Sequence, residues 1–174
     1  MRPFKILLTV IATELLLFAS CEKDKTELPV EFKFVLLDTL GNEKTVFNQG
    51  ENIIFSFQVI NNSSEDLYLE NFLPNDEFFR VYQPNTYGGT LNYGIPYESY
   101  IKIGSFKIPA NGILNIEYPW EGGMFWNEEY PILSSESRNE DLPNGDYYTE
   151  FSQSFKIGDI QTEEKHFEIN FTIQ

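Results

Sequence analysis

Histidine, cysteine and basic residues are all scarce in this sequence. Its 174 residues include one histidine, His166, and one cysteine, Cys21, with 12 lysines and arginines against 27 acidic residues. A single cysteine forms no disulfide bond within the chain, so the fold has to be stabilised by its core. The formal charge of −15 excludes nucleic acid as a partner, because an acidic surface repels the phosphate backbone.

The same absences exclude most catalytic and metal sites. A Ser-His-Asp arrangement would have to use His166, and no G-x-S-x-G nucleophile motif is present. Zinc sites usually take several histidine or cysteine ligands, and this chain offers one of each. Residues 139–146 place Asn and Asp in a turn, but these residues favour turns without any calcium. We therefore predict a protein that is not an enzyme and that takes neither a metal nor a cofactor.

Long hydrophobic runs are absent after the first twenty residues. Arg2 and Lys5 precede the mostly apolar run ILLTVIATELLLFAS (residues 6–20), which Glu14 interrupts. A positive start, an apolar run and small residues at its end are typical of a cleaved signal peptide. A permanent membrane-spanning helix needs about 20 apolar residues and is the weaker interpretation.

The end of this run, LFASC (residues 17–21), resembles the lipobox of bacterial lipoproteins. The resemblance implies that Cys21 is acylated and becomes the mature N-terminus, although Phe18 stands where an aliphatic residue is usual. An ordinary cysteine after a cleaved signal peptide is the alternative. The following tract, EKDKTE, resembles the tether of lipoproteins from the Bacteroidetes. These resemblances imply a protein of the bacterial cell envelope that is attached to the membrane through a lipid on Cys21.

Three segments are expected: a signal peptide over residues 1–20, a polar tether over 21–30 and one domain over 31–174. Within the domain, apolar residues recur at every second position, which is the period of strands with one dry and one wet face. The alternation is clearest over residues 31–38, 52–60, 146–157 and 166–174.

Turn sequences separate these segments, and no stretch carries a helical period of useful length. The turns include NQGE (48–51), NNSSED (61–66), PANG (109–112) and LPNG (142–145). Several short strands separated by turns predict an all-β fold. We expect an immunoglobulin-like antiparallel β-sandwich.

The order of these motifs resembles that of BsuPI-type proteinase inhibitor domains. The resemblance rests on FNQGENIIFSFQVINNSSEDLYL (47–69), IPANGILNIEYPW (108–120) and LPNGDYYTEF (142–151). It implies an immunoglobulin-like sandwich and suggests a protein partner, such as a protease. No inhibitory residue is carried over, because a fold does not fix a function.

Both tryptophans lie in the stretch PWEGGMFWNEEYP, residues 119–131. Trp120 continues the alternation of the strand before it, so we expect it in the core. Trp126 follows a Gly-Gly pair that breaks the strand, and its neighbours are polar. An aromatic ring beside amide and carboxylate groups suits a sugar ring.

This stretch and the tyrosines of residues 85–104 are therefore a candidate ligand-binding surface at one end of the sandwich. The alternative is that both loops fold over that end as an aromatic lid. The sequence thus predicts a binding module for a glycan or, alternatively, for a protein. The candidate ligand-binding residues are Trp126, Asn127, Tyr130, Tyr93 and Tyr97, with Tyr87 and Tyr100 in the same insertion.

Asp38-Thr39-Leu40 resembles the acceptor pattern for O-linked glycans on exported proteins of the Bacteroidetes. The triplet lies directly before Gly41-Asn42, a turn sequence. We therefore expect Thr39 to be exposed and regard it as a candidate for O-glycosylation.

Overall fold

The computed structural model describes residues 28–85, 87–96, 104–120 and 141–174. These residues form twelve strands in three sheets and contain no helix. The three-stranded sheet has the order β1-β3-β8, with β1 Val30–Leu37, β3 Ile54–Asn61 and β8 Ile113–Pro119. The five-stranded sheet has the order β2-β12-β9-β5-β6, with β2 Val46–Phe47, β12 Lys165–Ile173, β9 Gly145–Gln153, β5 Val81–Pro84 and β6 Thr90–Gly94. The four-stranded sheet has the order β11-β10-β4-β7, with β11 Ile160–Gln161, β10 Lys156–Ile157, β4 Leu67–Phe72 and β7 Gly104–Ile108.

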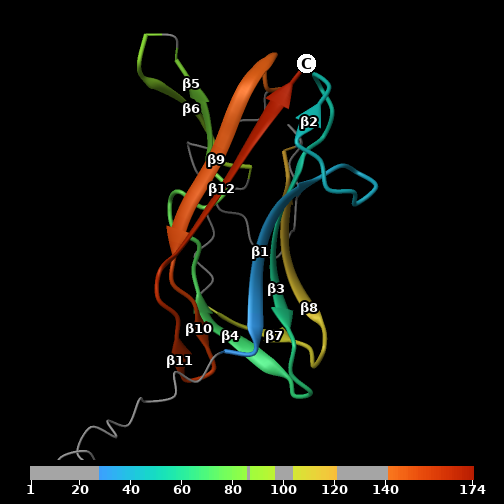
Figure 1. The fold of residues 1–174 in the computed structure, drawn as a ribbon, viewed down its shortest axis with the longest axis vertical. Coiled ribbons are helices and arrows are strands. Elements are labelled where there is room, and N and C mark those ends of the chain that lie inside the picture. The colour runs from blue at the N-terminus through green and yellow to red at the C-terminus, as the bar shows by residue number, and fades with distance from the viewer. Residues whose placement is uncertain (1–27, 86, 97–103, 121–140) are drawn as a thin grey trace, which may run out of the picture.

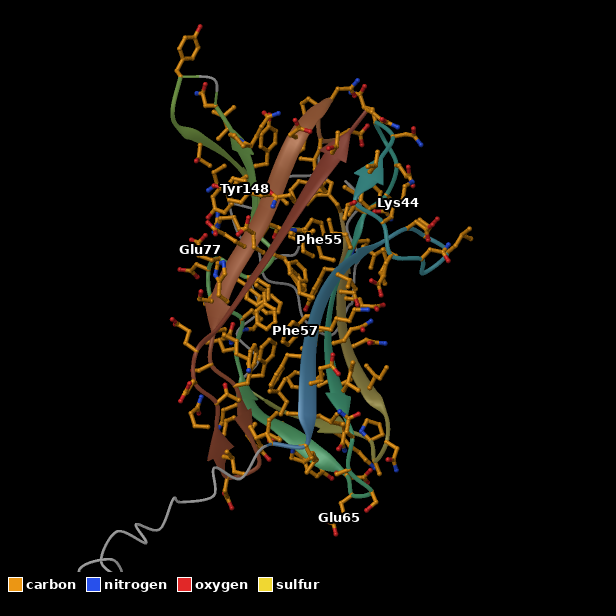
Figure 2. All side chains as sticks on the ribbon, in the orientation of Figure 1. Lys44, Phe55, Phe57, Glu65, Glu77 and Tyr148 are labelled. Carbon is orange, nitrogen blue, oxygen red and sulfur yellow. The ribbon has the colours of Figure 1, made fainter. Side chains whose placement is uncertain are left out.

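The three-stranded and five-stranded sheets form the two layers of a β-sandwich, and the four-stranded sheet lies at one end of it (Figure 1). The core between the layers is largely aromatic. Figure 2 shows Phe55 and Phe57 of β3 in the space between the layers. The ring centroid of Phe57 lies 5.9 Å from that of Phe151 of β9 and 5.4 Å from that of Phe167 of β12. These contacts join the two layers and confirm the predicted all-β sandwich.

Alternation along the strands decides which side chains enter this core. Phe55, Phe57 and Val59 of β3 are fully buried, as expected from their shared period. On β12, the side chains of His166 and Glu168 are exposed, while Phe171 is buried. Trp120 is 7% exposed and belongs to the core, which confirms the prediction for the first tryptophan.

Two features differ from the predicted antiparallel strands. β2 pairs with β12 in parallel, so the five-stranded sheet is mixed. The segment 146–157 is also not one strand, because β9 ends at Gln153 and β10 pairs with β4 in another sheet. Phe155 N–H donates to Thr162 Oγ1 and Thr162 N–H donates to the Phe155 carbonyl, each at 2.8 Å. These bonds close the β10–β11 hairpin and turn the chain out of the five-stranded sheet.

The first described strand begins inside the segment predicted as a tether. β1 starts at Val30, and the side chains of Leu28 and Val30 pack against the core. Both are apolar residues at the end of an otherwise charged tract, so burial of their side chains favours their joining the domain.

Candidate functional site

The β5–β6 hairpin lies at the edge of the five-stranded sheet and stands away from the body of the sandwich (Figure 1). Hydrogen bonds fix the turn at its tip. Asn85 N–H donates to the Gly89 carbonyl at 2.7 Å, and Tyr87 N–H donates to Asn85 Oδ1 at 3.1 Å. Gly88 has a φ of 85°, a conformation that favours glycine. These bonds hold Tyr87, Gly88 and Gly89 against Asn85.

Tyr87 is the most exposed of the large apolar side chains that the structure describes, at 96%. Leu91, on β6 of the same hairpin, is 46% exposed. Binding residues commonly lie on loops that a rigid scaffold holds in place. The hairpin meets that description, since it offers an aromatic ring and an aliphatic side chain to solvent.

A tyrosine pair extends this surface onto the outer face of the sheet. Tyr82 of β5 and Tyr148 of β9 are cross-strand partners, with ring centroids 5.2 Å apart and an angle of 22° between the rings. Tyr148 Oη lies 3.5 Å from Thr90 Oγ1 at the start of β6. We call Tyr82, Tyr87, Thr90 and Tyr148 the hairpin surface. Leu91 pairs with Gln83 and therefore lies on the other face of the hairpin.

Glu77 fixes the hydroxyl of Tyr82, which donates a hydrogen bond to the carboxylate. Burial, and then this carboxylate, raise the pKa of the Tyr82 phenol well above its usual value of 10. The phenol therefore stays protonated and acts as a donor. Figure 2 shows Glu77 and Tyr148 on the same side of the five-stranded sheet, next to the hairpin. Aromatic rings with hydroxyl and carboxylate neighbours are thus grouped on one face.

The predicted ligand-binding residues fall into two groups. Tyr93 lies at the base of the hairpin, half-buried, where its hydroxyl donates to Gln83 Oε1 at 3.0 Å. Its ring meets Tyr147 edge-on at 5.3 Å, so Tyr93 packs the hairpin against the core. The remaining four lie outside the described residues, as does the predicted lipid site Cys21. These four are Tyr97, Trp126, Asn127 and Tyr130.

Tyr82 and Tyr148 are not among the predicted ligand-binding residues, although the sequence contains a signal for one of them. Tyr148 alternates onto the polar face of its strand, opposite the buried Tyr147. An aromatic residue at a wet-face position can pack against an aromatic residue of the neighbouring strand. The partner, Tyr82, depends on the register of β5 against β9, which alternation alone does not give.

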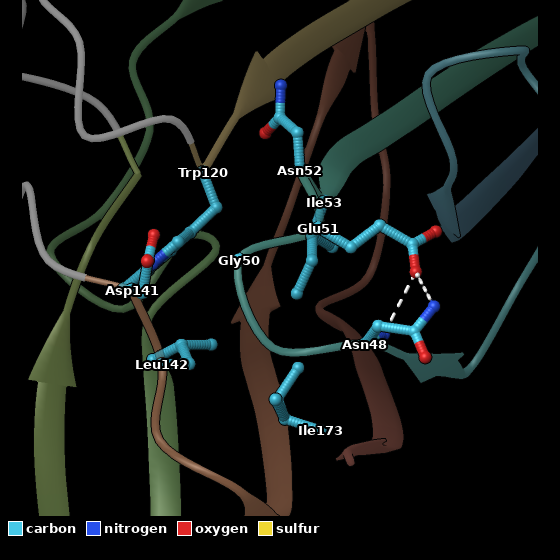
Figure 3. A pocket seen from close by; sticks show the side chains of 9 residues that line it. All are labelled: Asn48, Gly50, Glu51, Asn52, Ile53, Trp120, Asp141, Leu142 and Ile173. Atoms are coloured by element: carbon cyan, nitrogen blue, oxygen red, sulfur yellow. Dashed lines mark hydrogen bonds between the residues drawn. The ribbon is translucent and has the colours of Figure 1, made fainter.

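A small pocket lies beside Trp120, at the loop between β2 and β3 (Figure 3). Its volume is about 80 Å³, whereas pockets for small organic ligands measure roughly 300 Å³ or more. Glu51 accepts hydrogen bonds from Asn48 N–H at 2.9 Å and from Asn48 Nδ2 at 3.0 Å. The backbone bond from Asn48, and then Lys44, lower the pKa of Glu51, so its carboxylate serves the loop. The pocket has room for water but not for a sugar ring. Its lining residues are Asn48, Gly50, Glu51, Asn52, Ile53, Trp120, Asp141, Leu142 and Ile173.

Thr39 is exposed in the turn that follows β1, as predicted. Asp38 organises this turn, because its Oδ1 accepts the N–H groups of Leu40 and Asn42, each at 2.9 Å. Hydrogen bonds from the Asn42 side chain and backbone lower the pKa of the Asp38 carboxyl. O-glycosylation of Thr39 stays a prediction.

The sequence matches no protein-family model, and neither a curated protein nor a solved structure matches it. Within the described residues there is no helix of the length and apolar character that crossing a membrane requires. The lipid anchor and the resemblance to BsuPI-type inhibitor domains therefore stay predictions.

Proposed function

We propose that this chain is a lipid-anchored binding module of the bacterial cell envelope, without catalytic activity, and that the hairpin surface contacts a glycan. Cys21 would carry the lipid, and the acidic tract after it would hold the sandwich away from the membrane. The observation that carries the proposal is Tyr87, an aromatic ring 96% exposed on a hydrogen-bonded turn.

Sugar rings are recognised through an apolar face and a ring of hydroxyl groups. Tyrosine rings provide flat apolar contact area, and their hydroxyls provide hydrogen bonds. The hairpin surface offers both, because the stacked Tyr82–Tyr148 pair lies beside the hydroxyl of Thr90. The hydroxyl of Tyr82 donates its hydrogen bond to Glu77, so the Tyr82–Tyr148 pair offers its ring face as the contact area.

Affinity electrophoresis of the full chain in gels that contain soluble glucans, mannans, xylans or pectins tests this proposal. We expect one of these polysaccharides to retard the protein. Tyr87→Ala should weaken the retardation about thirtyfold, because truncating an aromatic residue that anchors a ligand costs about 2 kcal/mol. Tyr68→Ala is the matched control, since Tyr68 is a 44% exposed tyrosine on β4 in a different sheet.

A protein partner is the second candidate, and a specific observation favours it. β6 is an edge strand, and Thr90, Leu91 and Asn92 are exposed along it. Exposed edges can accept a strand from another protein, as the suggested protease partner would require. In that case no polysaccharide retards the chain. Capture of an envelope protein would then be lost in Leu91→Lys and kept in Tyr87→Ala, and this result would overturn the glycan proposal.

A further inference from the structure

The outer face of β9 and β12 brings one imidazole and two carboxylates together, away from the hairpin surface. Glu168 of β12 is the cross-strand partner of Glu150 on β9, and His166 is the partner of Ser152. His166 and Glu168 are two positions apart and therefore point to the same side of the sheet. One ligand atom from each of Glu150, His166 and Glu168 lies within 4.8 Å of the other two.

The two carboxylates stand in an unfavourable position without a cation. Like charges directly opposite one another on neighbouring strands destabilise a sheet. Among the described residues, the group within ion-pair distance of Glu168 is the imidazole of His166, with Nε2 and Oε2 3.8 Å apart. Lys165, the nearest lysine in sequence, places its ammonium 5.7 Å from the ring centroid of Phe32. A divalent cation between Glu150 and Glu168 would remove this repulsion.

The imidazole is oriented for metal binding. Ser152 Oγ lies 3.1 Å from Nδ1 of His166. When Nδ1 carries the proton and donates to Ser152, the lone pair on Nε2 is free, and Nε2 lies 3.8 Å from Glu168 Oε2. Asn170 Nδ2 donates to Glu168 Oε1 at 3.1 Å, which leaves Oε2 toward the imidazole. Ser152 and Asn170 thus hold the two ligands from behind, as outer-shell partners do in metal sites.

We propose that Glu150, His166 and Glu168 form a binding site for a divalent transition metal of the zinc class. Tetrahedral Zn²⁺ holds nitrogen and oxygen ligands at about 2.0–2.2 Å, which puts neighbouring ligand atoms about 3.3 Å apart. Rotation of the half-buried Glu150 side chain and of the exposed Glu168 side chain would close the present separations to that value. The imidazole selects against Ca²⁺ and Mg²⁺, which take oxygen ligands.

The site leaves one coordination position to water or to a ligand from solution. The side chains of His166 and Glu168 are 57% and 47% exposed, so the metal exchanges freely with solvent. The scarcity of histidine and cysteine in the sequence predicts no zinc site, whereas the strand pairing places two carboxylates beside the histidine. The H-x-E spacing at residues 166–168 was the local signal.

His166 makes the test direct, because it is the one histidine of the chain. NMR of the full chain without a polyhistidine tag should show a single imidazole signal set. We expect addition of Zn²⁺ to shift these signals saturably at one equivalent, and Mg²⁺ at the same concentration to leave them unchanged. Calorimetry in the same buffer should give one site.

Variants separate a built site from general attraction to an acidic protein. His166→Ala, Glu150→Gln and Glu168→Gln should each weaken Zn²⁺ binding by more than tenfold, and Asn170→Ala by about tenfold. Glu164→Gln removes the same charge two residues before His166 and should leave the affinity unchanged. Equal binding by Glu164→Gln and the three ligand variants would overturn the proposal, as would the absence of any saturable shift in the wild-type chain.

Discussion

The hydroxyl of Thr149 is a polar group in an apolar place. The residue is fully buried on β9, and its cross-strand partners are Val81 of β5 and Ile169 of β12. Within the part of the chain that the structure describes, Thr149 Oγ1 has no hydrogen-bond partner. Burying a hydroxyl without a hydrogen bond costs about 1–3 kcal/mol.

Thr149→Val replaces this hydroxyl with a methyl group of similar shape and keeps the β-branch that the strand favours. We expect the free energy of unfolding to rise by about 1–2 kcal/mol, because the buried polar group is removed without opening a cavity. In a domain of this size, each kcal/mol moves the thermal midpoint by about 2–4 °C, so Tm should rise by roughly 2–8 °C.

The same substitution at Thr172 is the matched control, with the opposite sign. Thr172 Oγ1 donates to Asp146 Oδ1 at 2.8 Å on the outer face of the sheet. Thr172→Val should therefore lower the free energy of unfolding by about 0.5–1 kcal/mol. Differential scanning calorimetry and urea unfolding of the three proteins measure both effects. A lower Tm for Thr149→Val would show that its hydroxyl makes a stabilising bond, and would refute the reasoning.

Two further predictions concern the turn after β1 and the lipid site. Asn42→Ala removes side-chain hydrogen bonds from the Asp38 carboxylate, so its pKa should rise toward 3.8 in an NMR titration. A carboxyl whose pKa is lower in the folded state than in the unfolded state stabilises the fold above its unfolded-state pKa, and this stabilisation is lost as the pH falls through its folded-state pKa. The variant should therefore lose the Asp38 contribution at a higher pH than the wild type. An unchanged Asp38 pKa would show that the Asn42 side chain has no such effect. Cys21→Ala should move the protein from the detergent phase to the aqueous phase in Triton X-114 partitioning, whereas an unacylated cysteine would leave the partitioning of the two proteins the same.

The strand faces were predictable because burial on one side of a strand imposes a period of two. His166, Glu168 and Asn170 alternate with the apolar residues of their strand, which places them on its wet face, and all three are exposed. Trp120 was placed in the core by the same argument, and it is 7% exposed. These predictions depend only on the sequence of one strand, because they require only that one of its faces is buried.

Strand pairing was not predictable in the same way, because register depends on contacts between distant residues. Nothing in the alternation sets Glu150 opposite Glu168, or Tyr82 opposite Tyr148. The parallel pairing of β2 with β12 also joins segments more than a hundred residues apart. The candidate sites described above are products of that register, which is why alternation gave their residue types and faces but not their groupings.

The position of β12 makes completion of the core depend on the C-terminal segment of the chain. β12 follows every other strand in the sequence, yet it lies between β9 and β2 inside the five-stranded sheet. A ribosome that has not reached residue 165 has therefore made Phe57 and Phe151 without the Phe167 ring that packs on both. Until then the aromatic core stays open, and exposed apolar surface of this kind promotes aggregation. The two-layer core is therefore complete only when the C-terminal strand has paired inside the sheet.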